Sequence, residues 1–178
     1  PAFLSTADAL RIRSALLIAL LFRQPEHPRI AEAARVLDTL LAAPDIETVS
    51  VNERVHAASI LFNYFNWKTK GDTADALIAR VEPWLADPRL MPKSRVWWQV
   101  HRAFNEQIRG RFARSQRIMK ETEAFAAADG LRWVQFEIYH AEVTALASSD
   151  DTVCHLAISG ADRGARRSAC KQEKASAR

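Results

Sequence analysis

The sequence predicts an all-α protein, and three observations support this fold class. Glycine is scarce, with five residues in 178, whereas the strong helix formers alanine, leucine, arginine and glutamate dominate the composition. Runs of alternating β-branched residues bounded by turn residues are missing. Apolar residues instead recur at helical spacing, in segments that come in pairs. The apolar and charged fractions, 48% and 26%, are typical of one globular domain that is long enough to bury a core.

The first pair of helices is expected over residues 6–22 and 28–42. Ile12 and Leu16 belong to the apolar face of the first segment, which ends at the prolines of RQPEHP. The second segment ends before Pro44. The two segments together predict a helical hairpin.

The third helix is expected to begin at Ser50, because Ser50 and Glu53 have the spacing of a capping box. Gly71 is expected to end this helix in the left-handed conformation, and Asp72 is expected to cap the next one. Pro83 predicts a kink in that fourth helix, or a break shortly after it.

Two more helices are expected over residues 93–109 and 111–128, joined by a turn at Gly110. A seventh helical pattern, over residues 131–148, begins a fourth pair. The sequence therefore predicts about four antiparallel helix pairs.

An internal period of 39 residues supports this arrangement. Gly71 and Gly110 are 39 residues apart, and Ser149 follows after the same interval. The same offset aligns three sets of apolar residues that share one helical face: Ala58, Trp97 and Phe136; Leu61, Val100 and Tyr139; Phe65, Phe104 and Val143. Such self-similarity is typical of an α-helical repeat, in which each hairpin packs on its neighbour.

Gly71-Asp72, Ala76 and Asp87-Pro88 together resemble the second half of a tetratricopeptide repeat. That family has Gly-Asp at the turn between its helices, an alanine four residues later and a proline near the end. The period here is longer than the family's usual period of about 34 residues. The chain is in this respect similar to the helical-repeat regions of large bacterial transcriptional regulators and signal-transduction ATPases.

The resemblance implies a right-handed α-α superhelix, a solenoid of about four antiparallel helix pairs over residues 1–150. Residues 151–178 are expected to form a polar, basic C-terminal tail that is either disordered or caps the last pair. Because the sequence opens at Pro1 within a helical pattern, we expect a fragment of a longer chain or a processed product.

A polar stripe follows the first helices of the second and third pairs. We take the following residues as candidate partner-binding positions: Asn63, Asn66, Lys70, Trp98, Arg102, Asn105 and Arg109. In stacked tetratricopeptide-like hairpins the first helices line the concave surface, so the resemblance implies a polar groove. Its amides could hydrogen-bond a peptide, its cations could attract acidic groups, and its tryptophan could serve as an aromatic anchor. A face that is simply solvated is the alternative.

These features predict a non-catalytic interaction, sensor or scaffold module of a bacterial regulatory protein. Its partner would be a peptide, a protein or another domain of the same polypeptide. The sequence contains no phosphate-binding loop, HExxH, GxSxG or paired-carboxylate motif, so we expect neither enzymatic activity nor a cofactor.

The histidines and cysteines do not predict a metal site. His101 and His140 are 39 residues apart but lack an evident third ligand. Cys154 and Cys170 lack CxxC spacing, and we expect free thiols in a reducing compartment, hence a cytoplasmic protein.

A nucleic-acid-binding helical repeat is the alternative function. From Arg163 onward the tail carries six basic residues and one acidic residue, and such a segment can neutralise phosphates without a fixed fold. A membrane partner is not expected, because the apolar stretch SALLIALLF is much shorter than the ~20 residues that span a bilayer.

Overall fold

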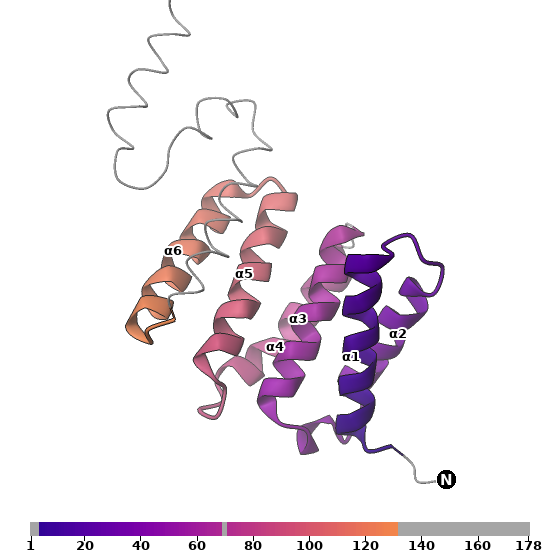
Figure 1. Ribbon diagram of the computed structural model, residues 1–178. Coiled ribbons are helices and arrows are strands. Elements are labelled where there is room, and N and C mark those ends of the chain that lie inside the picture. The colour runs from indigo at the N-terminus through magenta and orange to yellow at the C-terminus, as the bar shows by residue number, and fades with distance from the viewer. Residues whose placement is uncertain (1–3, 69–70, 132–178) are drawn as a thin grey trace, which may run out of the picture. The chain divides into compact units, whose positions relative to one another are not determined.

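The computed structural model describes residues 4–68 and 71–131, which belong to one compact unit, Pro1–Arg132. In this part of the chain all regular structure is helical, and there is no strand (Figure 1). The predicted all-α class is therefore confirmed for the described residues. The expected fourth pair and the C-terminal tail lie outside them, so the solenoid of four pairs stays a prediction.

The described chain forms three pairs of helices. Their bounds are α1 (Thr6–Arg23), α2 (Ile30–Leu41), α3 (Val51–Trp67), α4 (Gly71–Leu85), α5 (Pro92–Ile108) and α6 (Phe112–Ala128). A short 3-10 helix, η1 (Ile46–Thr48), lies between α2 and α3. Each helix packs against its partner in the pair, and α3 also packs against α1 and α5 (Figure 1). The first helices of the three pairs thus lie side by side.

Two hydrogen bonds show that α3 and α5 run parallel. At their starts the Asn52 side chain accepts a bond of 2.8 Å from the Met91 backbone N–H. Near their ends the Asn105 amide donates to Asn66 Oδ1 at 2.7 Å. Both bonds join residues 39 positions apart, whereas α3 and α5 begin 41 positions apart, at Val51 and Pro92. The period found in the sequence therefore relates residues that touch across an interface.

The helix ends follow most of the signals in the sequence. Ser50 Oγ accepts from the Glu53 N–H at 3.3 Å, as the capping box predicts. Gly110 has a φ of 72° and ends α5 in the left-handed conformation. The prediction for Gly71 was wrong, because Gly71 is the first residue of α4 and Asp72 lies inside the first turn. Helix α4 ends at Leu85, two residues after Pro83, which is one of the two expected outcomes.

The buried face of α1 differs from the expected one. Leu10, Leu17 and Leu21 are buried, whereas Ile12 is 52% exposed. The segment SALLIALLF is apolar in nearly every direction, so periodicity alone could not orient it.

Helix α3 is the centre of the described core. Twelve of its 17 residues are buried, because α1, α2, α4 and α5 all pack against it. The largest fully buried side chain, Trp98 of α5, stacks on Phe62 of α3 with ring centroids 5.0 Å apart. The sequence placed Trp98 on a binding surface, but this side chain is fully buried in the core.

A buried amide pair connects α3 with α5. The exposed fractions of Asn66 and Asn105 are 2% and 4%. Besides accepting from Asn105, the Asn66 side chain donates to the His101 carbonyl oxygen at 3.3 Å. Buried polar groups are costly when they lack partners, so each amide stabilises the fold through the other.

Replacing Asn66 with alanine is expected to lower the free energy of unfolding by about 1–3 kcal/mol, because the buried Asn105 donor loses its acceptor. Denaturant unfolding of Asn66→Ala, Asn105→Ala and the double variant should reveal a coupling energy above about 0.5 kcal/mol between the two side chains. The exposed Gln116 provides the control, since its alanine variant should stay within about 0.5 kcal/mol of the parent. Strictly additive effects of the two asparagine variants would contradict this pairing.

His101 predicts a pH dependence of stability. Its ring lies edge-on to Trp97, with centroids 4.9 Å apart, and burial lowers its pKa from 6.5 to about 4. The unfolded chain binds the proton more tightly, so this contribution to stability is complete above pH 6.5 and is lost as the pH falls toward 4. Between pH 7 and 5, we expect His101→Gln to remove about 1–2 kcal/mol of the pH dependence in urea unfolding. An unchanged slope in this variant would refute the assignment.

Candidate functional site

The polar stripe predicted from the sequence does not form one open surface. Asn66, Asn105 and Trp98 are buried between the helices, and Asn63 is half-buried. Lys70 lies outside the described residues. Within the contact between α3 and α5, Asn66 and Asn105 bond each other and do not face water.

The two arginines of the stripe contact α4. Arg109 forms an ion pair of 2.9 Å with Asp75 and donates to the Gly71 carbonyl oxygen at 2.5 Å. Arg102 lies 3.8 Å from Glu82. A Cβ at Gly71 would lie 3.3 Å from the Arg109 guanidinium, so the glycine allows this arginine to approach closely. These cations hold α5 against the second pair, which the helical wheel could not show.

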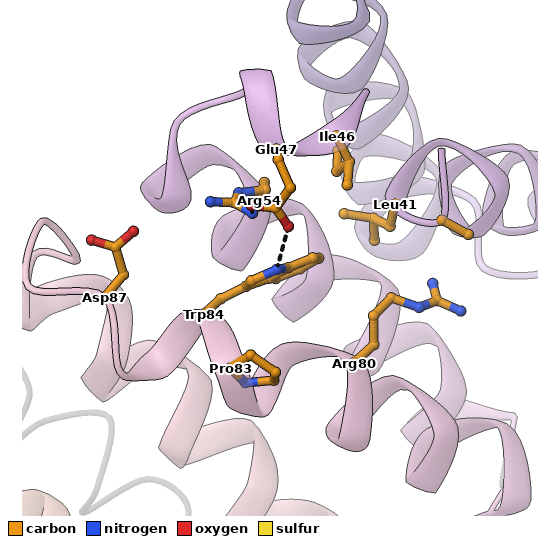
Figure 2. Close-up of a pocket in the computed structure, with 9 residues that line it drawn as sticks. Leu41, Ile46, Glu47, Arg54, Arg80, Pro83, Trp84 and Asp87 are labelled. Atoms are coloured by element: carbon orange, nitrogen blue, oxygen red, sulfur yellow. Dashed lines mark hydrogen bonds and ion pairs between the residues drawn. The ribbon is translucent and has the colours of Figure 1, made fainter. Parts of the chain in front are cut away.

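The structure has a cleft of about 570 Å³ elsewhere, between the first two helix pairs (Figure 2). It is lined by Leu41, Ala42, Ile46, Glu47, Arg54, Arg80, Pro83, Trp84 and Asp87. These residues come from the end of α2 and the residue after it, η1, the start of α3, and α4 with the segment that follows it. Apolar walls with a few charged groups, and a volume between about 300 and 1,000 Å³, are typical of binding sites.

The innermost charge of the cleft is Arg54. Its side chain is only 3% exposed, and its guanidinium lies over the Trp84 ring, 5.0 Å from the centroid. The capping box fixes Arg54 in the first turn of α3, on a helix that is buried on most sides. A buried cation needs a counter-ion and hydrogen-bond acceptors, because desolvation of its charge is expensive.

Glu47, which lies in η1, provides Arg54 with the counter-ion and the hydrogen-bond acceptor. One of its carboxylate oxygens pairs with Arg54, and the other accepts a hydrogen bond of 3.2 Å from the Trp84 indole N–H. Figure 2 shows Glu47 above the plane of Trp84, with Arg54 beside it. The Glu47 side chain is nevertheless 68% exposed, so Glu47 lies on the solvent side of its ion pair with Arg54.

Two further ion pairs flank the cleft, and their members Arg80 and Asp87 lie on opposite sides of Trp84 in Figure 2. Arg80 bonds Asp38 at 2.8 Å, with both side chains about one-third exposed. Asp87 accepts two hydrogen bonds from the Arg89 side chain, which lower the pKa of its carboxyl group to about 2. Positively and negatively charged side chains thus alternate around the apolar residues of the cleft.

The lining of the cleft combines charged and apolar side chains. It contains two arginines and two carboxylates, but no histidine, cysteine or hydroxyl group that could act as a nucleophile or as a base near neutral pH. Of the proposed histidine pair, His101 contacts Trp97 and His140 lies outside the described residues. Among residues 4–68 and 71–131 no three histidine, cysteine or acidic side chains gather to hold a metal ion.

Sequence reasoning missed this cleft. Its polar core comes from three separate elements, and no spacing relates Glu47, Arg54 and Trp84 before the chain folds. One signal was available, since Arg54 is a charged residue that precedes Val55 on a largely apolar helix. Such a residue usually requires a partner from elsewhere in the chain.

Comparisons with known proteins do not assign the chain to a family. No family model matches it, and neither does any curated protein or solved structure. The resemblance to tetratricopeptide repeats therefore stays a prediction. Among the helices described here, none has the length and apolar character needed to cross a membrane.

Replacing Glu47 with alanine is expected to destabilise the fold by about 1–3 kcal/mol, because the buried Arg54 guanidinium loses its acceptor. The double variant Glu47→Ala with Arg54→Met should recover part of this loss, since methionine fills the space without a charge. Thermal and denaturant unfolding measure both effects.

Asp38→Ala is the matched control, since the Arg80 side chain that it leaves unpaired is 30% exposed and the loss should be less than about 1 kcal/mol. A double variant that is less stable than Glu47→Ala alone would show that the Arg54 charge does not cause the loss.

Proposed function

We propose that this chain is a non-catalytic protein-interaction module, and that the cleft around Trp84 binds a peptide segment of its partner. The observation that carries the proposal is the cleft itself, whose lining combines apolar residues with charged side chains that form ion pairs. Shape and apolar area provide affinity at such sites, while the charged groups select the partner.

The cleft is suited to this role because rigid elements form its walls. Leu41 and Trp84 belong to helices α2 and α4, and both are almost fully buried. The side chains of a preformed site lose little conformational entropy when a ligand binds. Pro83 lies exposed beside the floor and presents a further stiff, apolar surface.

The resemblance to tetratricopeptide-like regions of bacterial regulators supports a sensor or scaffold role in the cytoplasm. The partner segment would then belong to another domain of the same regulator or to a separate protein. This proposal replaces the groove expected along α3 and α5, whose polar groups already bond one another.

The described residues do not favour nucleic acid over protein as the partner. Arg80 at the cleft pairs with Asp38, and Arg102 and Arg109 of α5 pair with Glu82 and Asp75. The basic tail that motivated the alternative lies outside the described residues.

A selection from a library of short random peptides against the full chain tests the proposal. Recovered peptides are expected to bind the parent and to lose at least about tenfold in affinity for Pro83→Arg, because a long cation blocks the side of the cleft. Isothermal titration calorimetry measures the change.

Lys120→Glu on the exposed face of α6 is the matched control, and it should bind as tightly as the parent. Peptides that bind Pro83→Arg and the parent equally well would exclude the cleft as the site.

A further inference from the structure

The donors that hold Glu47 form a receptor for one carboxylate group. Arg54 donates to one oxygen of Glu47, and the Trp84 indole N–H donates to the other. The two donors belong to different helices, α3 and α4, which the core holds in place. Charge-assisted bonds of this type are among the strongest polar contacts in proteins.

The two halves of this contact differ in how firmly they are held. The Arg54 side chain is 3% exposed and Trp84 is 7% exposed, whereas the Glu47 side chain is 68% exposed. Glu47 belongs to a helix of three residues, which is anchored in the core by Ile46. The Glu47 side chain can therefore turn out into solvent while Ile46 remains packed.

Arg54 also has an unused donor. Its Nε atom is buried and has no hydrogen-bond partner, although the guanidinium lines the cleft. An arginine binds a carboxylate best through two parallel N–H groups, and Glu47 uses only Nη1. A carboxylate that arrives from the cleft could engage a second N–H and so satisfy the guanidinium more fully than Glu47 does.

We propose that Arg54 and Trp84 bind an acidic side chain of the partner peptide, and that Glu47 occupies this position in the free chain as an internal substitute. The inference rests on the proposed function, because the acidic residue is delivered by a peptide bound in the cleft. The exposed Ala42 and Pro83 provide apolar surface in the same cleft, so an apolar residue next to the acid completes the motif.

Rescue by a small carboxylate tests the receptor without any knowledge of the partner. In Glu47→Ala the receptor is empty, and propionate is expected to raise the melting temperature in a concentration-dependent manner, by about 2 °C or more at saturation. The parent should respond less, because Glu47 competes. Propionamide, which has no charge, should leave all variants unchanged.

The matched control is Glu47→Ala combined with Arg54→Met, which lacks the main donor and should not respond to propionate. An equal response of this double variant, or no response of Glu47→Ala, would overturn the receptor. If Glu47→Ala does not fold, Glu47→Gln takes its place, and propionate should shift the NMR signal of the Trp84 indole N–H, assigned by loss in Trp84→Phe. An unmoved signal would equally overturn it.

The experiments distinguish failure of the receptor from failure of the proposed function. Selected peptides that depend on the cleft but show no preference for an acidic residue, together with failed rescue, would leave the interaction module intact and remove the receptor. Successful rescue without any cleft-dependent peptide would retain the receptor and remove the peptide partner.

Discussion

The burial of α3 on most of its sides is the constraint from which the rest of the described structure follows. A helix with so little contact with water must be covered by apolar groups in nearly every direction, and α1, α2, α4 and α5 provide this cover. Any polar side chain on α3 must then find a partner on a neighbouring element. Asn66 accepts a hydrogen bond from Asn105, and Arg54 pairs with Glu47 and lies over the Trp84 ring.

These two polar contacts have different roles. The amide pair lies in the interface between two first helices, where a slip by one turn would leave both amides without partners. It therefore fixes the register of α5 on α3. The contact around Arg54 lies where three elements meet at an open cleft, and there the same requirement for partners creates a site that another molecule can reach.

Local signals predicted the helices well because their causes are local. The capping box at Ser50 and the left-handed Gly110 act within a few residues of the chain, so the sequence alone defines them. The stripe from Asn63 to Arg109 was harder to interpret. A helical wheel shows that residues share a face, but it cannot distinguish a face toward water from one toward a neighbouring helix whose polar groups match.

The cleft could not be predicted because its groups meet only through tertiary structure. Glu47 lies in η1, Arg54 in the first turn of α3, and Trp84 in the last turn of α4, and their positions depend on how the first two pairs pack. The 39-residue offset illustrates the same limit. It detected a real relation between Asn66 and Asn105, which the folded chain expresses as a direct hydrogen bond.

The coverage of α3 also determines where this protein can change during evolution. One inserted residue in α3 would rotate all following side chains of the helix by about 100°. The core residues would then no longer pack against the four neighbouring helices. Helix α6 buries only four of its 17 residues, along a single stripe, and can accept substitutions on most of its surface. We therefore expect insertions and deletions to be tolerated best in the connections between helices, and the 3-10 segment that carries Glu47 lies in one of them. The segment that carries Glu47 can thus diverge while the helices that hold Arg54 and Trp84 stay unchanged.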